Sequence, residues 1–274
     1  MTLTNDELIE TAKSEDAPVL LRQMSLLALA DLQDQRVIDI ALGLLEGESA
    51  DLASWSVWVL SKVKSNKAVT PLINALDHKD PKTREYTALS LGELGDIQAI
   101  EPLVRVLQDS DPNVREAAAK GLGRLKATTA VNALRIALND PEPQVRWASA
   151  SALGHIGDSK SLNLLLTLAL NQEEHIEVRS SAIIALGRLG IKNIVPILGE
   201  IFLERKEKNK VRMATAMALG ELKDERALLV LKLGQSNDFD SGKEDDFIRV
   251  VMEARRAIAT IQQFTKVANK VSTD

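Results

Sequence analysis

Cysteine is absent from this chain of 274 residues, and aromatic residues make up only 3% of it. Without cysteine the chain holds no disulfide, thiolate zinc site or iron–sulfur ligand. It also lacks an apolar run near the roughly 20 residues that cross a bilayer, and its first residues are not a basic segment followed by an apolar core. We therefore expect a cytoplasmic protein that does not enter a membrane.

The sequence also lacks the short motifs of common catalytic sites. Its three histidines, His78, His155 and His175, form no H-x-x-x-H or H-E-x-x-H pair, and neither a phosphate-binding G-x-x-x-x-G-K-[ST] nor a G-x-S-x-G occurs. A net charge of −5 argues against a protein that binds the phosphate backbone of nucleic acid. We predict no catalytic residue, no metal, no cofactor and no nucleic-acid partner, and we expect a protein that is not an enzyme.

What the chain does contain is a repeat. Five segments share an arginine followed eight residues later by a glycine, and the arginines are 31, 31, 33 and 33 residues apart: Arg84, Arg115, Arg146, Arg179 and Arg212. Counting back by 31 from Arg84 reaches Ala53 and then Arg22, where the apolar spacing continues. The spacing predicts an array of about seven units.

Each unit has the pattern of two amphipathic helices. With the arginine position as zero, apolar or small residues occur at −1, +3, +4, +7 and +10, which form one helical face, and glycine near +11 is typical of a helix end. A second apolar-periodic segment follows in each unit, and no alternating stretch suggests a sheet. We therefore predict an all-α fold, a right-handed α-solenoid of about seven stacked two-helix repeats.

The array sets the expected domain boundaries. We predict an N-terminal capping segment over 1–17, the repeat array over 18–233, an acidic loop over 234–246, and a C-terminal capping helix with a polar tail over 247–274. The segment FIRVVMEARRAIATI (247–261) can be aligned with the pattern around Arg249, but its register is ambiguous, and a closing helix fits it better.

These units resemble HEAT repeats, in particular the short variety named after the phycobilisome lyases. The shared features are V-R at the start of the arginine helix, L-G seven and eight residues later, G-D at the turn, and D-P before the arginine. The resemblance implies a ladder of ion pairs between an aspartate before the helix and the arginine within it. Asp80 with Arg84 and Asp111 with Arg115 match this pattern, whereas Glu142, His175 and Lys208 stand at the aspartate position in later units.

The resemblance also implies which surface carries function. Positions +1, +5 and +9 lie opposite the buried face of the arginine helix and are expected to line the concave surface. This surface is expected to be polar, yet several of these positions are apolar or aromatic, and such residues are typical of protein-binding hot spots. We predict that the partner-binding residues are Trp55, Trp58, Tyr86, Leu89, Lys120, Arg124, Trp147, His155, Ile184, Arg188, Met213 and Met217.

Two functions remain open from the sequence. The first is a non-enzymatic scaffold or adaptor that binds another protein on its concave face. The alternative, which the repeat subtype implies, is a phycobilin lyase subunit or a phycobilisome assembly or degradation factor that holds a bilin and its acceptor phycobiliprotein. Trp55 and Trp58 also fit ordinary core positions, packed against the adjoining units, and Trp55 fits such a position better than Trp58 does.

Overall fold

The computed structural model describes residues 3–45, 47, 49–64, 66–204, 206–236 and 244–271, and the regular secondary structure of these residues is helical. Within these ranges there are sixteen α-helices, five short 3-10 helices and no strand, which confirms the all-α prediction. The α-helices are α1 (Asn5–Lys13), α2 (Val19–Asp31), α3 (Arg36–Leu45), α4 (Ala50–Val63), α5 (Val69–Ala75), α6 (Pro81–Leu94), α7 (Ile100–Val106), α8 (Pro112–Arg124), α9 (Val131–Ala137), α10 (Pro143–Ile156), α11 (Leu162–Leu170), α12 (Ile176–Arg188), α13 (Val195–Leu203), α14 (Asn209–Leu222), α15 (Arg226–Ser236) and α16 (Glu244–Val271). The 3-10 helices are η1 (Asn66–Ala68), η2 (Ile97–Ala99), η3 (Thr128–Ala130), η4 (Ser159–Ser161) and η5 (Lys192–Ile194).

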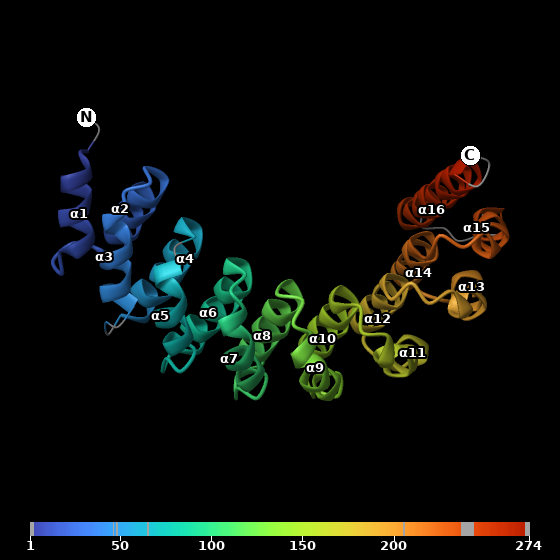
Figure 1. The fold of residues 1–274 in the computed structure, drawn as a ribbon, viewed down its shortest axis with the longest axis horizontal. Coiled ribbons are helices and arrows are strands. Elements are labelled where there is room, and N and C mark those ends of the chain that lie inside the picture. Colours follow the sequence, from blue (N-terminus) through green and yellow to red (C-terminus); the bar gives the residue numbers. More distant parts are fainter. Residues whose placement is uncertain are drawn as a thin grey trace. The chain divides into compact units, whose positions relative to one another are not determined.

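Seven helix pairs, α2–α3 to α14–α15, follow one another between α1 and α16, so the predicted array of about seven two-helix repeats is confirmed. The chain divides into two units, Met1–Ala133 and Leu134–Asp274, and the division falls within α9. In the first unit α2, α4, α6 and α8 pack side by side as one layer, and α3, α5 and α7 lie along one face of this layer (Figure 1). In the second unit α10, α12, α14 and α16 form the corresponding layer, backed by α11, α13 and α15 (Figure 1).

The arginine helices begin and end at residues suited to those places. Asp80 caps α6, because its carboxylate accepts a hydrogen bond from the Thr83 N–H at 2.8 Å, and Pro81 occupies the first helical position, where a missing N–H costs little. The expected helix end at +11 is present in all seven repeats as a residue with positive φ. Three of these residues are glycine, and four are not: Gln33, Lys64, Lys126 and Lys223.

Small residues let neighbouring arginine helices approach closely. A Cβ placed on Gly92 of α6 would lie 2.5 Å from the Cα of Gly121 in α8, and one placed on Gly187 of α12 would lie 2.6 Å from the Cα of Ala218 in α14. No side chain fits at such separations. Packing within the layer therefore requires glycine at +8 in these two repeats.

The last helix, α16, continues the layer of the second unit. It packs against α14, and a Cβ on Gly220 would lie 2.9 Å from the Cβ of Ala257. In the preceding repeats the glycine at +8 faces position +6 of the next arginine helix, so Ala257 at +6 places Val251, not Arg249, at position zero. Val250, Ala254, Ala257 and Ile261 are buried in agreement with this register.

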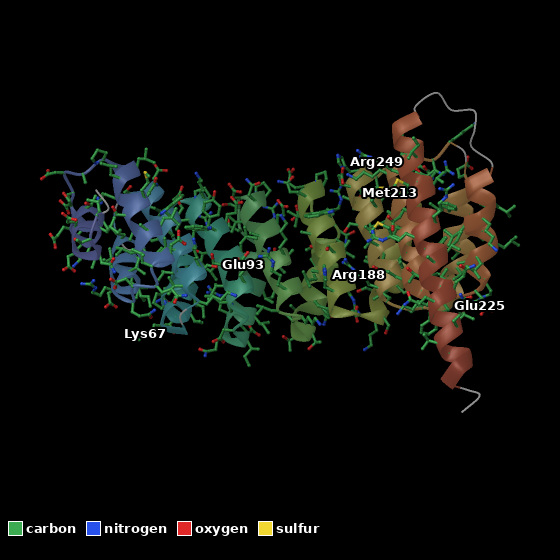
Figure 2. The ribbon with its side chains drawn as sticks, turned by 90° about the horizontal axis from the view of Figure 1, so that it is seen from above. Lys67, Glu93, Arg188, Met213, Glu225 and Arg249 are labelled. Carbon is green, nitrogen blue, oxygen red and sulfur yellow. The ribbon has the colours of Figure 1, made fainter. Side chains whose placement is uncertain are left out.

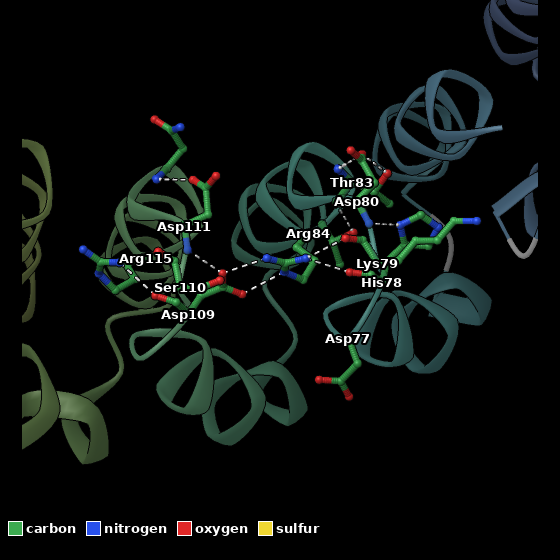
Figure 3. Close-up of polar contacts among 12 residues, drawn as sticks. Asp77, His78, Lys79, Asp80, Thr83, Arg84, Asp109, Ser110, Asp111 and Arg115 are labelled. Atoms are coloured by element: carbon green, nitrogen blue, oxygen red, sulfur yellow. Dashed lines mark hydrogen bonds and ion pairs between the residues drawn. The ribbon is translucent and has the colours of Figure 1, made fainter. Parts of the chain in front are cut away.

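The ion-pair ladder exists, but its carboxylates differ from those that the HEAT resemblance implied. Arg84 Nε and Nη2 each donate to the Asp109 carboxylate at 2.8 Å, while Arg84 Nη1 donates to the carbonyl oxygen of His78 (Figure 3). Asp80 and Asp111 cap their helices instead, through Thr83 and Asn113. The arginine pairs instead with Asp109, in the loop before the next arginine helix.

The ladder also continues in the later repeats, where the aspartate is missing. Arg146 Nη2 donates to Glu174 at 2.6 Å, and Arg179 Nη2 donates to Glu207 at 2.6 Å. Both glutamates directly precede the residue that caps the next helix. Burial alone would raise the pKa of Glu207, but hydrogen bonds from Arg179 and the Lys208 N–H outweigh this effect and lower it.

The structure describes parts of the predicted capping segment and of the predicted acidic loop. In the expected capping segment 1–17, α1 covers Asn5–Lys13. Of the expected acidic loop, residues 234–236 end α15, residues 244–246 begin α16, and residues 237–243 lie outside the described residues. No helix in the described part of the chain has the length and apolar character to cross a membrane.

Candidate protein-binding faces

The predicted outward positions differ strongly in exposure. Every residue at +9 is exposed, most residues at +5 are half-buried, and at +1 Ser54 and Ser180 are buried. The prediction of a uniformly solvent-facing line is therefore wrong at Ser54 and Ser180, which neighbouring arginine helices cover. The surface available to a partner follows +5 and +9, together with +2 and the half-buried Glu85 at +1 in the first unit, and with Trp147, Met213 and Met252 at +1 in the second.

In the first unit this strip carries an apolar cluster, which we call the unit-1 patch: Met24, Trp55, Trp58, Tyr86 and Leu89. Met24 is 56% exposed, Trp58 41% and Tyr86 38%, while Leu89 is half-buried. Equivalent positions lie next to one another on adjacent helices, because Trp55 of α4 bonds to Gln23 of α2 and Arg124 of α8 pairs with Glu93 of α6. The five side chains thus form one patch across α2, α4 and α6.

The two tryptophans of α4 have different environments. Trp55 is half-buried, and its Nε1–H donates to the Gln23 carbonyl oxygen at 3.0 Å, so it joins α4 to α2. Trp58 packs against it with ring centroids 5.2 Å apart and is 41% exposed. Lys62 Nζ lies 5.0 Å from the Trp58 ring centroid and pairs with Asp31 at 2.5 Å. Trp58 is therefore a preorganised exposed ring.

A row of ion pairs borders the unit-1 patch. Arg124 Nη1 pairs with Glu93 at 2.9 Å, and Glu93 also accepts the Ser61 hydroxyl. Lys120 pairs with Glu116 at 2.6 Å on the same helix. Both predicted basic residues thus have carboxylate partners, and the border of the patch has both signs of charge.

One carboxylate beside the patch has no such partner. Glu85 of α6 is half-buried, and none of the ion pairs among the described residues includes it. Burial raises the pKa of Glu85, and the nearby carboxylates of Glu116 and Asp111 raise it further, against the smaller opposite effects of Lys120 and Lys82. This negative charge is destabilised in the isolated chain.

The second unit carries a separate cluster, the unit-2 patch, formed by Trp147, Ile184, Met213, Met217 and Met252. The first four are half-buried, and Met252 at +1 of α16 is 62% exposed. Figure 2 labels Met213 of α14, which packs against α16. The sequence prediction missed Met252, because in α16 position zero is Val251 instead of arginine and position +8 is Ala259 instead of glycine.

At the +9 edge of the unit-2 patch, His155, Arg188 and Glu221 lie on successive helices. His155 Nδ1 is 2.9 Å from the Ser151 carbonyl oxygen and 3.4 Å from Arg188 Nη1. Burial raises the pKa of Glu221, although Arg188 and His155 act in the opposite direction. These polar contacts between helices are exposed and border the unit-2 patch.

Two features bear on a metal or catalytic site in the part of the chain that the structure describes. Among the described residues, no group of three or more His, Asp or Glu side chains is placed to hold a metal ion. On the other side of the first unit's layer, a hollow of about 330 Å³ lies between α3 and α5, lined by Leu42, Leu45, Thr70, Pro71, Asn74, Ala75, Asp77 and His78. It is open to solvent.

Comparisons with solved structures identify chains of the same fold. The complex of CpcE and CpcF of phycocyanin lyase from Nostoc sp. PCC7120 includes a chain with 24% identity and a TM-score of 0.53, over 86% of this chain and 95% of that one. YibA from E. coli gives 22% identity and a TM-score of 0.64, with 93% of both chains covered. A chain in the complex of Kap95p with RanGDP gives 14% identity and a TM-score of 0.66, over 98% of this chain and 44% of that one.

Sequence comparison gives the family. No curated protein matches the chain. The profile of HEAT repeats matches three overlapping stretches, residues 69–138, 100–174 and 165–240, which together cover more than half of the sequence. Together with the seven helix pairs, the arginine ladder and the close glycine contacts, this match shows that the chain belongs to the HEAT-repeat family.

Proposed function

We propose that the chain is a non-enzymatic scaffold or adaptor that binds another protein on the exposed face of its arginine helices. The observation that carries the proposal is the unit-1 patch, where Met24, Trp58 and Tyr86 remain exposed on adjacent helices. Trp58 is held in place by Trp55 and Lys62, so little conformational entropy is lost when a partner covers it. Large rings of this kind commonly dominate binding energy.

The unit-2 patch is proposed as a second contact region. Its half-buried residues Trp147, Ile184, Met213 and Met217 contribute apolar surface, and His155 and Arg188 contribute a polar edge. Methionine side chains adapt to irregular surfaces, so Met213 and Met217 suit a partner with mixed aliphatic groups. Lys120 and Arg124, in the first unit, pair with Glu116 and Glu93. This charged rim is proposed to fix the register of the partner.

The experiment is affinity purification with the full chain as bait. Wild type is compared with Trp58→Ala combined with Leu89→Ala, and the control is Ile97→Ala, which removes a 75% exposed side chain from η2. We expect a partner that wild type and the control retain equally and that the double variant loses. Equal recovery with all three proteins would reject the patch.

The alternative function is that of a phycobilin lyase subunit or a phycobilisome assembly or degradation factor. Its support is the short repeat subtype together with the fold shared with a chain of the CpcE–CpcF phycocyanin lyase complex. In this case the partner is a phycobiliprotein, and a bilin is held between the two proteins. Mixing the chain with phycocyanobilin tests it: a red-shifted absorption band supports the alternative, and an unchanged spectrum at stoichiometric protein removes it.

A further inference from the structure

The unit-1 patch has one electrostatic feature that specifies its partner, and this inference rests on the proposed protein-binding function. Glu85 lies on α6 between Tyr86, its neighbour in sequence, and Leu89, one turn further along the same helix. It is half-buried, so its charge is only partly hydrated. The carboxylates of Glu116 on the neighbouring helix α8 and of Asp111, which caps that helix, repel its charge.

The nearby cations do not neutralise this carboxylate. Lys120 pairs with Glu116 at 2.6 Å, and Lys82 Nζ lies 5.9 Å from the ring centroid of Tyr86. The opposing carboxylates, Glu116 above all, act on Glu85 more strongly than either lysine does. A new cation at contact distance stabilises a half-buried carboxylate strongly, because the attraction between opposite charges is stronger where water is partly excluded.

The aromatic rings themselves are less suited to receive that cation. Lys62 already lies 5.0 Å from the Trp58 ring centroid, and Lys82 occupies the same place over Tyr86. A positive group from a partner would meet these ammonium groups if it approached the rings. The carboxylate of Glu85 is then the favoured contact for a cation, and the free surfaces of Met24, Trp58 and Leu89 are left for apolar groups.

We propose that the unit-1 patch binds a basic amphipathic segment of another protein, whose lysine or arginine pairs with Glu85 while its adjacent apolar side chains cover Trp58 and Leu89. An acidic segment would bring a third negative group toward Glu85 and Glu116 and is disfavoured. A neutral apolar segment would bury Glu85 further without compensation. Charge complementarity therefore selects the basic segment.

The test uses two fluorescein-labelled peptides of 16 residues with the same leucine stripe at helical spacing. The stripe is flanked by lysine in one peptide and by glutamate in the other, and binding to the full chain is followed by fluorescence anisotropy in low salt. We expect wild type to bind the lysine peptide at least about 10-fold more tightly than the glutamate peptide. Glu85→Gln is expected to reduce this preference several-fold, since one close ion pair with partial burial is lost.

Two further variants keep the result interpretable. Glu101→Gln removes an exposed carboxylate of α7, away from the unit-1 patch, and it is expected to change the affinity for the lysine peptide by less than about 2-fold. Glu85→Lys is expected to reverse the preference toward the glutamate peptide. Thermal unfolding of Glu85→Gln is expected at or above the temperature of wild type, because a destabilised charge is removed.

The inference is overturned if neither peptide binds at 1 mM, if both bind equally, or if Glu85→Gln leaves the preference unchanged. Its failure differs from failure of the proposed function. If binding of a natural partner depends on Trp58 but not on Glu85, the scaffold function stands and the basic segment is rejected. If a partner binds without dependence on Trp58, the patch itself is rejected.

Discussion

The ion pair between Arg179 and Glu207 gives the largest effect on stability that we expect from one charge. The two side chains are 4% and 2% exposed, and Arg179 Nη1 and Nη2 donate to the carboxylate at 2.9 and 2.6 Å. Glu207→Gln keeps the size of the side chain but leaves the guanidinium buried without a counterion. Breaking a buried pair in this way costs about 3–5 kcal/mol.

The matched control is Glu177→Gln, which breaks the exposed pair with Lys210, whose side chains are 43% and 46% exposed. An exposed pair contributes about 0–1 kcal/mol. A second control replaces both partners by Arg179→Met with Glu207→Leu, which removes the two charges together. This double variant is expected to recover much of the loss, because apolar residues of similar volume remove the desolvation cost of both ions.

The assay is urea unfolding followed by circular dichroism at 222 nm. With a slope of about 2 kcal/mol per molar urea, a loss of about 4 kcal/mol lowers the midpoint by about 2 M. Arg179 and Glu207 both belong to the second unit, so the transition of that unit is expected to shift. The reasoning is refuted if Glu207→Gln shifts the midpoint no more than Glu177→Gln does.

Three further predictions concern stability. Lys126→Gly is expected to raise the free energy of unfolding by about 1 kcal/mol, because Lys126 has φ of 50°; an unchanged melting temperature would contradict this. Gly187→Ala is expected to lower stability by about 1–3 kcal/mol through the contact with Ala218, whereas Gly43→Ala, with open space around it, is expected to raise it by about 0.5–1 kcal/mol; equal effects in thermal unfolding would contradict the packing argument. The pKa of Glu207 is lowered by folding, so the stabilisation by its charge is complete above the unfolded-state pKa of about 4.3 and is lost as pH falls through the lower folded-state pKa. The urea midpoint of Glu207→Gln is therefore expected to fall less than that of wild type below about pH 4, and parallel curves would contradict this.

The architecture could be predicted from the sequence because its causes are local and repeated. Arginine at zero, glycine at +8 and the helix end at +11 recur at 31–33 residues, and each has a packing or capping reason that the structure shows. The positive φ at Lys64, Lys126 and Lys223 shows that the turn persists where glycine is replaced. The position in the repeat, more than the residue type, determines this turn.

The ladder carboxylates could not be predicted in the same way. Asp109 lies two residues before the cap of its helix, whereas Glu174 and Glu207 lie one residue before theirs. The acid that meets each arginine therefore has no constant offset from the cap residue. Only the path of the loop between units brings Asp109 to Arg84.

The candidate site was predictable in composition but not in extent. Trp58 and Tyr86 lie on the exposed side as helical geometry predicts, while Ser54 and Ser180 are covered by neighbouring helices. Met252 requires the register of α16, which the contact between Gly220 and Ala257 fixes and the sequence leaves ambiguous.

The central claim is that Trp58 is an exposed anchor for a protein partner. The most direct measurement is isothermal titration of the purified partner, once captured, into wild type, Trp58→Ala and Ile97→Ala. We predict that Trp58→Ala weakens binding by about 2 kcal/mol, roughly 30-fold in Kd, and that Ile97→Ala leaves it within about 2-fold. Equal affinity of the three proteins for the partner would contradict the account.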